Sequence, residues 1–405
     1  MKISPGALSR FKVLELGSTI AGPFCGRLLA DFGAQVIKIE DPAGDVIRTM
    51  GESFNGKSLY AASLLRNKST VSVDLRTTEG RQVVKRLATQ CDVLIENFRP
   101  GTIEKWGLGY EELAKENPKL VMVRISGFGQ SGPYSSWPGY GIISEATSGL
   151  RSLTGDPDRP PSRMATALTD YLTGLYGAFG ALVALLEREM SGQGQVIDAA
   201  LSESAFSFME PFVPAYEKLG VVANRAGSKL PGAAPNNLFT TGDGDFIHIA
   251  AWHDTLFRRF CSVMERPDLA DDERFKNLPG RVKHSNELDD LIAAWTGSLP
   301  LDVLETRLQD AGIPATRIFT IADIFKDRHY KAREALVAVP DASLGGSVTL
   351  AAPVPKLDRT PGKINHAGRE HGQDTRAVLM EVGGYSSEEI DALVKQGVVQ
   401  ESKTS

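Results

Sequence analysis

The sequence predicts an α/β protein whose first part is a doubly wound parallel sheet. Residues 12–16, 24–32 and 35–39 read as strand, helix and strand, with a Gly/Pro-punctuated loop before the helix and Gly33 after it. That punctuation is typical of a βαβ unit, which joins parallel strands. Because the same alternation recurs further along, we expect a parallel sheet with helices on both faces.

The later elements of this first part follow from their own patterns. Apolar runs rich in Val and Ile predict strands at 70–75, 92–98 and 119–129, and 78–91 has the spacing of an amphipathic helix. A long apolar helix is expected near 168–190, and the stretch VIDAALSESAF begins a further element. The first part is therefore predicted to be one α/β layer structure.

A second, smaller domain is predicted after a linker. The stretch 224–237 is rich in Gly, Pro and Asn, which is typical of a loop. It is followed by a strand at 246–252 and a helix at 255–264. The tail returns with a strand at 347–357 and a helix at 386–397, which has a Ser cap and an acidic first turn.

Composition excludes several classes of protein. The net charge of −5 is not that of a nucleic-acid binder, which has a basic excess. The three cysteines are far apart and form no CxxC pair, so we expect a cytoplasmic protein without disulfides. No signal peptide is recognised, and the apolar run 175–186 is too short to span a membrane. No nucleic-acid or membrane partner is therefore predicted.

No metal site is predicted either. His248 and His253 have a spacing found in zinc fingers, as do His366 and His371. No CxxC pair accompanies them, and the sequence has no HExxH motif. These histidines are interpreted as surface or packing residues.

The loop 17–23 lies where a parallel strand feeds a helix. Its two glycines are five residues apart, which is not the GxGxxG spacing of a dinucleotide fingerprint. An anion site at the helix N-terminus and a plain turn both remain open on these residues.

A group of cations and an aromatic residue follows at strand ends. Asn97, Phe98 and Arg99 come just after a predicted parallel strand, at the edge where open α/β sheets bind ligands. Arg99 offers a planar fork for a phosphate and Phe98 a stacking face, and Lys105 follows closely. Together with Arg66 and Lys68 near another strand start, they suggest a nucleotide-phosphate site, with solvated surface charges as the alternative.

The helix near 168–190 combines an acid with internal glycines. Leucines and Phe179 form one apolar stripe, and Gly174, Gly177 and Gly180 each cost about 1 kcal/mol relative to Ala. This cost is tolerable where something approaches the helix closely, and a neighbouring helix, another subunit and a narrow ligand all remain open. With Thr166 or Thr169 as the cap, Asp170 lies in the first turn, where the helix dipole stabilises its anion. From these residues alone, a helix-end role and a catalytic role for Asp170 both stay open.

Nearly the whole chain resembles the family III CoA-transferases, the superfamily of formyl-CoA transferase and carnitine-CoA transferase that includes alpha-methylacyl-CoA racemase. The motifs that carry the resemblance are VLELGSTIAGPFCGRLLADFGAQVIKIE (13–40), RNKSTVSVDL (66–75), NFRPGTIEKWGLGYEEL (97–113), NPKLVMVRISGFGQSGP (117–133), TALTDYLTGLYGA (166–178) and SGQGQVIDAAL (191–201).

This resemblance implies a Rossmann-like large domain with a smaller α/β domain, in two chains threaded through one another as an interlocked dimer. The large CoA-binding domain would comprise residues 1–222 completed by 331–405, and the small domain residues 223–330. A homodimer is expected, and a hetero-oligomer remains open.

The resemblance also implies the chemistry. Asp170 matches the family's nucleophile, which attacks an acyl-CoA thioester and carries CoA as an aspartyl thioester before a free carboxylic acid takes it. Acyl-CoA and the acid are substrates, and no prosthetic group is implied. A succinyl-CoA donor, or a similar dicarboxylyl-CoA, is expected.

Contacts to CoA transfer residue by residue. Asn97, Phe98 and Arg99 match the motif near adenine and the 3′-phosphate, and Lys105 matches a basic residue near the CoA phosphates. The positions Ile20, Ala21 and Tyr140 complete the expected site. The loop 227–237 occupies the place of a mobile lid but lacks an unbroken glycine run.

Two substitutions and two rival functions complete the prediction. Ile20 and Gly141 replace a glutamine and a glutamate of formyl-CoA transferases, which argues against oxalate as the acceptor. An alpha-methylacyl-CoA racemase is the main alternative, but its histidine–aspartate pair is missing at Tyr140–Gly141. The other alternative is a non-catalytic subunit, against which Asp170 counts.

Overall fold

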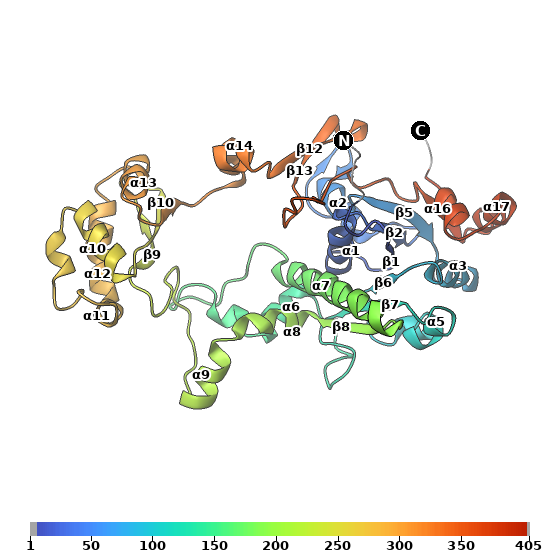
Figure 1. The fold of residues 1–405 in the computed structure, drawn as a ribbon, viewed down its shortest axis with the longest axis horizontal. Helices are drawn as coiled ribbons and strands as arrows, with labels where there is room; N and C mark the ends of the chain where they lie inside the picture. The colour runs from blue at the N-terminus through green and yellow to red at the C-terminus, as the bar shows by residue number, and fades with distance from the viewer. Residues whose placement is uncertain (1–5, 403–405) are drawn as a thin grey trace. The chain divides into compact units, whose positions relative to one another are not determined.

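A computed structural model describes residues 6–402. The chain divides into two compact units (Figure 1). The first comprises residues up to 150, 164–220 and from 332 onward, and the second comprises 151–163 and 221–331.

A seven-stranded sheet forms the centre of the first unit. Its strands are ordered β14-β5-β2-β1-β6-β7-β8, and all are parallel except β14. The order reverses direction between β1 and β6, so this is a doubly wound α/β fold as predicted. The bounds are β1 Lys12–Glu15, β2 Gln35–Glu40, β5 Lys68–Val73, β6 Val93–Glu96, β7 Val121–Ser126, β8 Val196–Ala200 and β14 Val399–Gln400.

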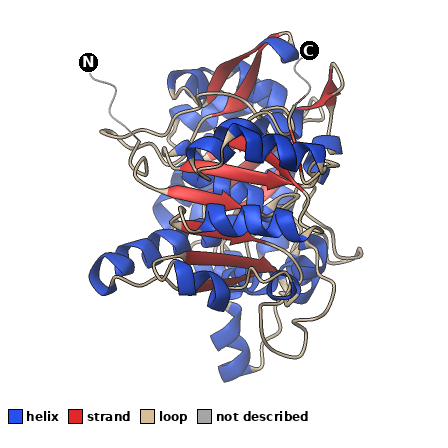
Figure 2. Cartoon of the chain, turned by 90° about the vertical axis from the view of Figure 1, so that its right-hand side faces the viewer, coloured by secondary structure: helices blue, strands red, loops and turns tan. Residues whose placement is uncertain are grey.

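Helices cover both faces of this sheet (Figure 2). Alternate strand residues supply the two cores: Val13 faces one and Leu14 the other. The first core packs α1 (Ala21–Asp31), α7 (Leu168–Ser191) and α8 (Leu201–Phe206), and the second packs α3 (Thr78–Ala88), α16 (Thr375–Glu381) and α17 (Ser387–Lys395). Strands buried on both faces read as continuous apolar runs, which explains their clear signal in the sequence.

The glycines of α7 permit the close approach that the sequence predicts, and the partner elements belong to the same chain. A Cβ on Gly174 would lie 2.7 Å from the carbonyl oxygen of Ala21 in α1. A Cβ on Gly177 would meet Cys25 Sγ and Val123 at 3.2 Å, and one on Gly180 would meet Ile197 at 2.9 Å. The glycines therefore bring α7 down onto α1, β7 and β8.

Helix α7 is also the one described helix long and apolar enough to cross a membrane by length and composition. A core helix passes the same test, and 44% of its most apolar window is buried within the chain. Its other face exposes Leu175, Phe179, Val183 and Leu186.

Short elements complete the first unit. They are η1 (Val46–Thr49), β3 (Ser53–Phe54), β4 (Lys57–Ser58), α2 (Leu59–Leu64), α4 (Thr102–Lys105), α5 (Tyr110–Glu116), α6 (Gly141–Thr147), η2 (Leu150–Leu153, which runs into the second unit), η3 (Ser207–Met209), α9 (Phe212–Leu219), β12 (Leu336–Asp341), η5 (Ala342–Leu344) and β13 (Gly346–Ala351).

The second unit has its own apolar core around an antiparallel sheet, β11-β10-β9. Phe257, Phe260 and Phe275 are buried in this core. Its elements are β9 (Asn236–Thr240), β10 (Phe246–Ala250), α10 (Asp254–Val263), η4 (Pro267–Ala270), α11 (Leu278–Lys283), α12 (Ser285–Thr296), α13 (Leu301–Asp310), β11 (Ala315–Arg317), α14 (Ile321–Lys326) and α15 (Arg328–Ala332), the last of which ends at the boundary with the first unit.

Element boundaries differ from the sequence prediction where side chains intervene. Helix α1 begins at Ala21, so Gly22 and Pro23 lie in its first turn, where proline needs no hydrogen bond. Strand β6 ends at Glu96, because Asn97 turns away to hydrogen-bond the backbone of Ser18.

Candidate active site

A pocket of about 360 Å³ opens at the carboxyl edge of the sheet, at the switch point between β1 and β6. Its wall is built by the loops that follow β1, β6 and β7 and by the start of α7. Open α/β sheets bind ligands at this position. The lining residues predicted from the sequence are Ile20, Ala21, Asn97, Phe98, Arg99, Tyr140 and Asp170.

Asp170 lies in the first turn of α7 and points into this pocket. The N-cap is Ala167 and has no side-chain hydrogen bond, so neither Thr166 nor Thr169 caps the helix as predicted. Burial raises the pKa of Asp170 to about 6, outweighing the hydrogen bond from its own backbone. Asp170 does lie in the first turn as predicted, but burial, which disfavours the anion, outweighs the hydrogen bond at the helix end.

The backbone of Gly141, the first residue of α6, lies against this carboxylate. A Cβ at Gly141 would be 2.0 Å from Asp170 Oδ2 and 2.6 Å from Thr169 Oγ1. The carboxylate therefore occupies the space that any larger residue at position 141 would need.

The three residues after β6 have different environments. The Asn97 amide is engaged by the backbone of Ser18, donating to its carbonyl at 2.9 Å and accepting from its N–H at 2.8 Å. Phe98 packs edge-on against Trp106, with ring centroids 5.0 Å apart. Arg99 is the one cation among the described lining residues.

Ile20, Ala21 and Tyr140 line the pocket from two sides. Ile20 is buried in an apolar cluster with Ile47 and Leu64. Ala21 begins α1, whose N-cap makes no side-chain hydrogen bond. Tyr140 is 76% exposed at the rim, so its ring is available to a ligand.

Three cations suggested by the sequence lie outside the pocket. Lys105 is exposed at the end of α4 and does not line it. Arg66 is buried and forms a two-pronged ion pair with Asp31, at 2.9 and 2.6 Å. Lys68 is buried and bonds Glu15 at 2.7 Å and the carbonyl of Pro23 at 2.6 Å. Arg66 and Lys68 are therefore structural, and their place in a phosphate site was wrongly predicted.

Sequence reasoning missed the part of the wall that follows β7. Ser126, Ser135 and Trp137 line the pocket, and Trp137 stacks on Tyr134 with centroids 4.1 Å apart. The Gly/Pro-rich stretch GFGQSGPYSSWPGY directly follows a parallel strand, which is the signal that would have indicated a ligand-facing loop.

A larger open cleft of about 650 Å³ lies at the other end of the strands. Its charged side chains are largely paired with one another: Arg188 contacts Asp92 at 2.9 Å, and Arg10 pairs with Glu189. The cleft contains none of the predicted site residues.

Comparisons with known proteins identify the family of the chain. Residues 8–375 match the family described as CoA-transferase family III. The succinyl-CoA–D-citramalate CoA-transferase of Chloroflexus aurantiacus is 44% identical over 397 residues, which cover 98% of both chains. The succinyl-CoA:mesaconate CoA-transferase of Haloarcula hispanica is 35% identical over 398 residues, covering 94% of this chain and 97% of that protein.

The fold has a solved counterpart. A CAIB/BAIF family protein from Brucella suis superposes with a TM-score of 0.84 and 34% identity, covering 94% of this chain and all of that one.

Proposed function

Because the chain belongs to the CoA-transferase family III, we propose that it moves CoA from succinyl-CoA, or a similar dicarboxylyl-CoA, to a free dicarboxylic acid. The observation that carries this proposal is the Asp170 carboxylate, desolvated at the floor of a pocket on the sheet's ligand-binding edge. The donor and acceptor classes rest on relatives whose names specify succinyl-CoA with citramalate, mesaconate or malate.

The proposed reaction begins at the Asp170 carboxylate. One of its oxygens attacks the thioester carbonyl of the donor, the C–S bond breaks, and a mixed anhydride and CoA thiolate form. The thiolate attacks the aspartyl carbonyl, which releases the donor acid and leaves CoA on Asp170 as a thioester. The acceptor carboxylate then displaces the thiolate from Asp170 to form a second anhydride, and the thiolate attacks the acceptor carbonyl, freeing Asp170. No net proton is consumed.

The environment of Asp170 supports this sequence. A carboxylate with few hydrogen bonds is a better nucleophile than a hydrated one, and a sheltered pocket slows hydrolysis of the anhydrides. Arg99 provides a positive charge in the pocket that can bind a CoA phosphate. The first turn of α1, which begins at Ala21 and has no side-chain cap, offers backbone N–H groups that can stabilise a developing oxyanion.

The composition of the pocket favours transfer over racemisation. Proton exchange at Cα needs two acid/base groups, one on each face of the carbon. Among the lining residues that the structure describes, Asp170 is the one carboxylate and no histidine is present.

We further infer a homodimer. Apolar side chains lie exposed along α7 and α9, including Phe179, Leu186, Tyr216 and Leu219. Patches of this kind mark interaction surfaces. Light scattering of the purified chain is expected to give twice the monomer mass, and a stable monomer would contradict the inference.

The catalytic proposal is tested by intact-mass analysis with succinyl-CoA. A CoA adduct is expected on the peptide that contains Asp170, and hydroxylamine should convert it to a hydroxamate. Adding citramalate or mesaconate should discharge the adduct and yield the new CoA thioester. Asp170→Ala should abolish both adduct and exchange; retention of exchange by this variant overturns the mechanism.

A further inference from the structure

The loop that follows β1 has an unusual backbone where it forms the pocket wall. Ser18, Thr19, Ile20 and Ala21 all line the pocket. Thr19 has φ +68°, a left-handed conformation that a β-branched residue adopts only when its surroundings impose it. The contacts that impose it come from Asn97, just after β6, and from Asp45, in the segment after β2.

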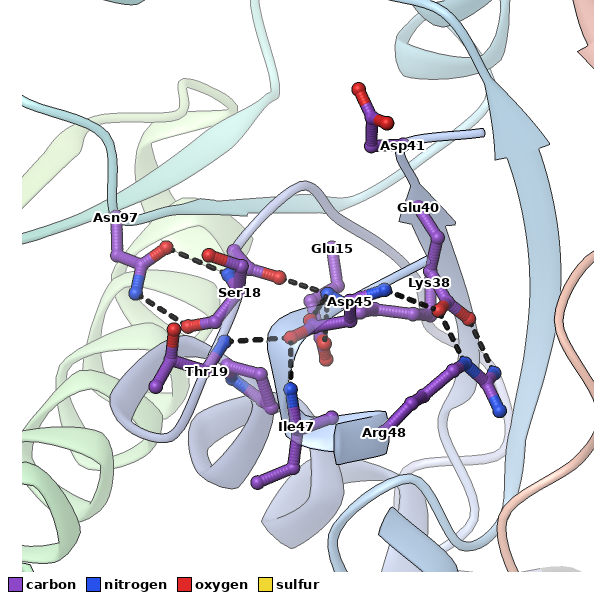
Figure 3. Close-up of polar contacts among 12 residues, drawn as sticks. Glu15, Ser18, Thr19, Lys38, Glu40, Asp41, Asp45, Ile47, Arg48 and Asn97 are labelled. Atoms are coloured by element: carbon purple, nitrogen blue, oxygen red, sulfur yellow. Dashed lines mark hydrogen bonds and ion pairs between the residues drawn. The ribbon is translucent and has the colours of Figure 1, made fainter. Parts of the chain in front are cut away.

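Asn97 clamps one side of this loop (Figure 3). Its amide both donates to and accepts from the backbone of Ser18, closing a ring of two hydrogen bonds. A Cβ on Gly17 would lie 3.2 Å from Asn97 Oδ1, and a Cβ on Gly22 would lie 3.5 Å from its Cγ. The loop is therefore pressed onto the Asn97 side chain at both of its ends.

A buried ion pair clamps the other side. Asp45 accepts from the N–H of Thr19 at 3.0 Å and contacts Lys38 Nζ at 2.7 Å. Lys38 in turn donates to the carbonyl of Gly17, and both charged side chains are 1% exposed. Figure 3 shows this chain of contacts running from Lys38 through Asp45 to Thr19.

The surroundings of Lys38 and Asp45 favour the charged form of each. Burial by itself would lower the pKa of Lys38, but Asp45, Glu15 and Glu40 outweigh it and raise the pKa. Burial would likewise raise the pKa of Asp45, but Lys38 and backbone N–H groups lower it. Buried ion pairs of this kind fix geometry, because displacing either partner leaves the other charge buried with weaker compensation.

We propose that Asn97 and the Lys38–Asp45 pair are positioning residues that hold the loop 17–20 in its left-handed form, so that this wall of the acyl-CoA pocket exists before the substrate binds. Asn97 then acts through Ser18 rather than by touching CoA. The inference rests on the proposed function only in that acyl-CoA is the ligand of this pocket.

A kinetic signature follows from this role. If the loop 17–20 has its ordered conformation in only a fraction of the free enzyme molecules, the apparent affinity for acyl-CoA is reduced to that fraction. A saturating concentration of acyl-CoA shifts all molecules to the ordered conformation. Loosening the loop should therefore raise KM for succinyl-CoA more than it lowers kcat.

The test is Asn97→Asp. Its carboxylate still accepts from the N–H of Ser18, but it cannot donate and repels the Ser18 carbonyl. We expect KM for succinyl-CoA to rise about tenfold with kcat within about twofold, as for a wall formed in a tenth of free molecules. Amide exchange of the peptide spanning the loop should also become faster in the free enzyme.

The matched control is Asn117→Asp. Asn117 donates to the carbonyls of Ala88 at 3.1 Å and Cys91 at 2.9 Å, and it does not line the pocket. This variant is expected to lower Tm and leave KM unchanged. If Asn97→Asp behaves in the same way, its role is structural only and the inference fails.

A second-site variant separates positioning from direct contact. Thr19→Gly removes the penalty at φ +68°, because glycine adopts this conformation freely. Combined with Asn97→Asp, it should recover most of the lost affinity. No recovery means that Asn97 contacts CoA itself, which overturns the inference.

The two proposals fail separately. A wild-type protein that shows no CoA exchange refutes the proposed function. An active wild type whose KM is unaffected by Asn97→Asp refutes only the positioning role.

Discussion

Gly141 and Asp170 are in direct contact. The Gly141 backbone lies so close to the Asp170 carboxylate that a Cβ on Gly141 would be 2.0 Å from Asp170 Oδ2. The contact joins the start of α6 to the start of α7. It restricts the position of the proposed nucleophile by packing against the backbone of α6.

Gly141→Ala is therefore expected to displace the carboxylate. Misplacing a reacting group by about 1 Å costs on the order of a hundredfold in rate, and we expect this loss in kcat/KM. The control is Gly109→Ala at the start of α5, where the nearest atom to a new Cβ is Glu104 Cγ, on an exposed side chain, at 3.1 Å. Equal activity of the two variants would show that the contact is dispensable.

The rate should depend on the ionisation of Asp170. Only the carboxylate attacks, and burial raises its pKa to about 6. We expect kcat/KM in the free enzyme to rise with pH through about 6 and to level off above pH 7. Rates measured from pH 5 to 8 with succinyl-CoA check this, and a plateau that already extends down to pH 5 would contradict a desolvated carboxylate.

Arg99 is predicted to bind a CoA phosphate, as its family motif implies. Arg99→Met should raise KM for succinyl-CoA by about tenfold, a typical loss for one charge-assisted contact. The sharper measurement repeats the comparison with succinyl-dephospho-CoA, which lacks the 3′-phosphate. If Arg99 binds that phosphate, the variant and wild type should use the truncated donor alike.

Lys105→Met is the companion to this experiment. Because Lys105 lies outside the pocket lining, its variant should change KM little. A KM increase as large as that of Arg99→Met would place the CoA phosphates along α4.

Arg66 is expected to matter for stability rather than for binding. Arg66→Met removes the two-pronged partner of the buried Asp31 and leaves it only the Asn67 amide and a longer contact to Arg27, which should cost about 3 kcal/mol. Urea unfolding measures the loss. The control is Arg76→Met, whose ion pair with Asp74 is mostly exposed on the arginine side. A raised KM for succinyl-CoA in properly folded Arg66→Met would restore Arg66 to the phosphate site.

The sequence predicted the fold and the site correctly where a residue pattern is compatible with only one kind of structure. Continuous apolar runs identified five of the six parallel strands, while β8 was predicted only as an unspecified element. The position of Asn97–Arg99 after β6 placed these residues at the ligand edge. The same rule applied to the loop after β7 would have found Trp137.

Charges were harder to assign, because a sequence does not show what a side chain faces. Lys68 and Arg66 looked like surface cations, yet both neutralise acids inside the fold. Asp170 looked like an ion stabilised by a helix end, and only the packing of α6 against it reveals its desolvation.

The pairing of β14 with β5 has a consequence for biosynthesis. Val399 pairs with Val73, so the outer edge of the central sheet is closed by residues translated long after the strand they cover. Until then a nascent chain carries β5 with one row of backbone hydrogen-bonding groups open, which invites pairing with other chains. This edge is completed only after residues 399–400 have been made, and we expect a chaperone that shields it to raise the yield of folded protein.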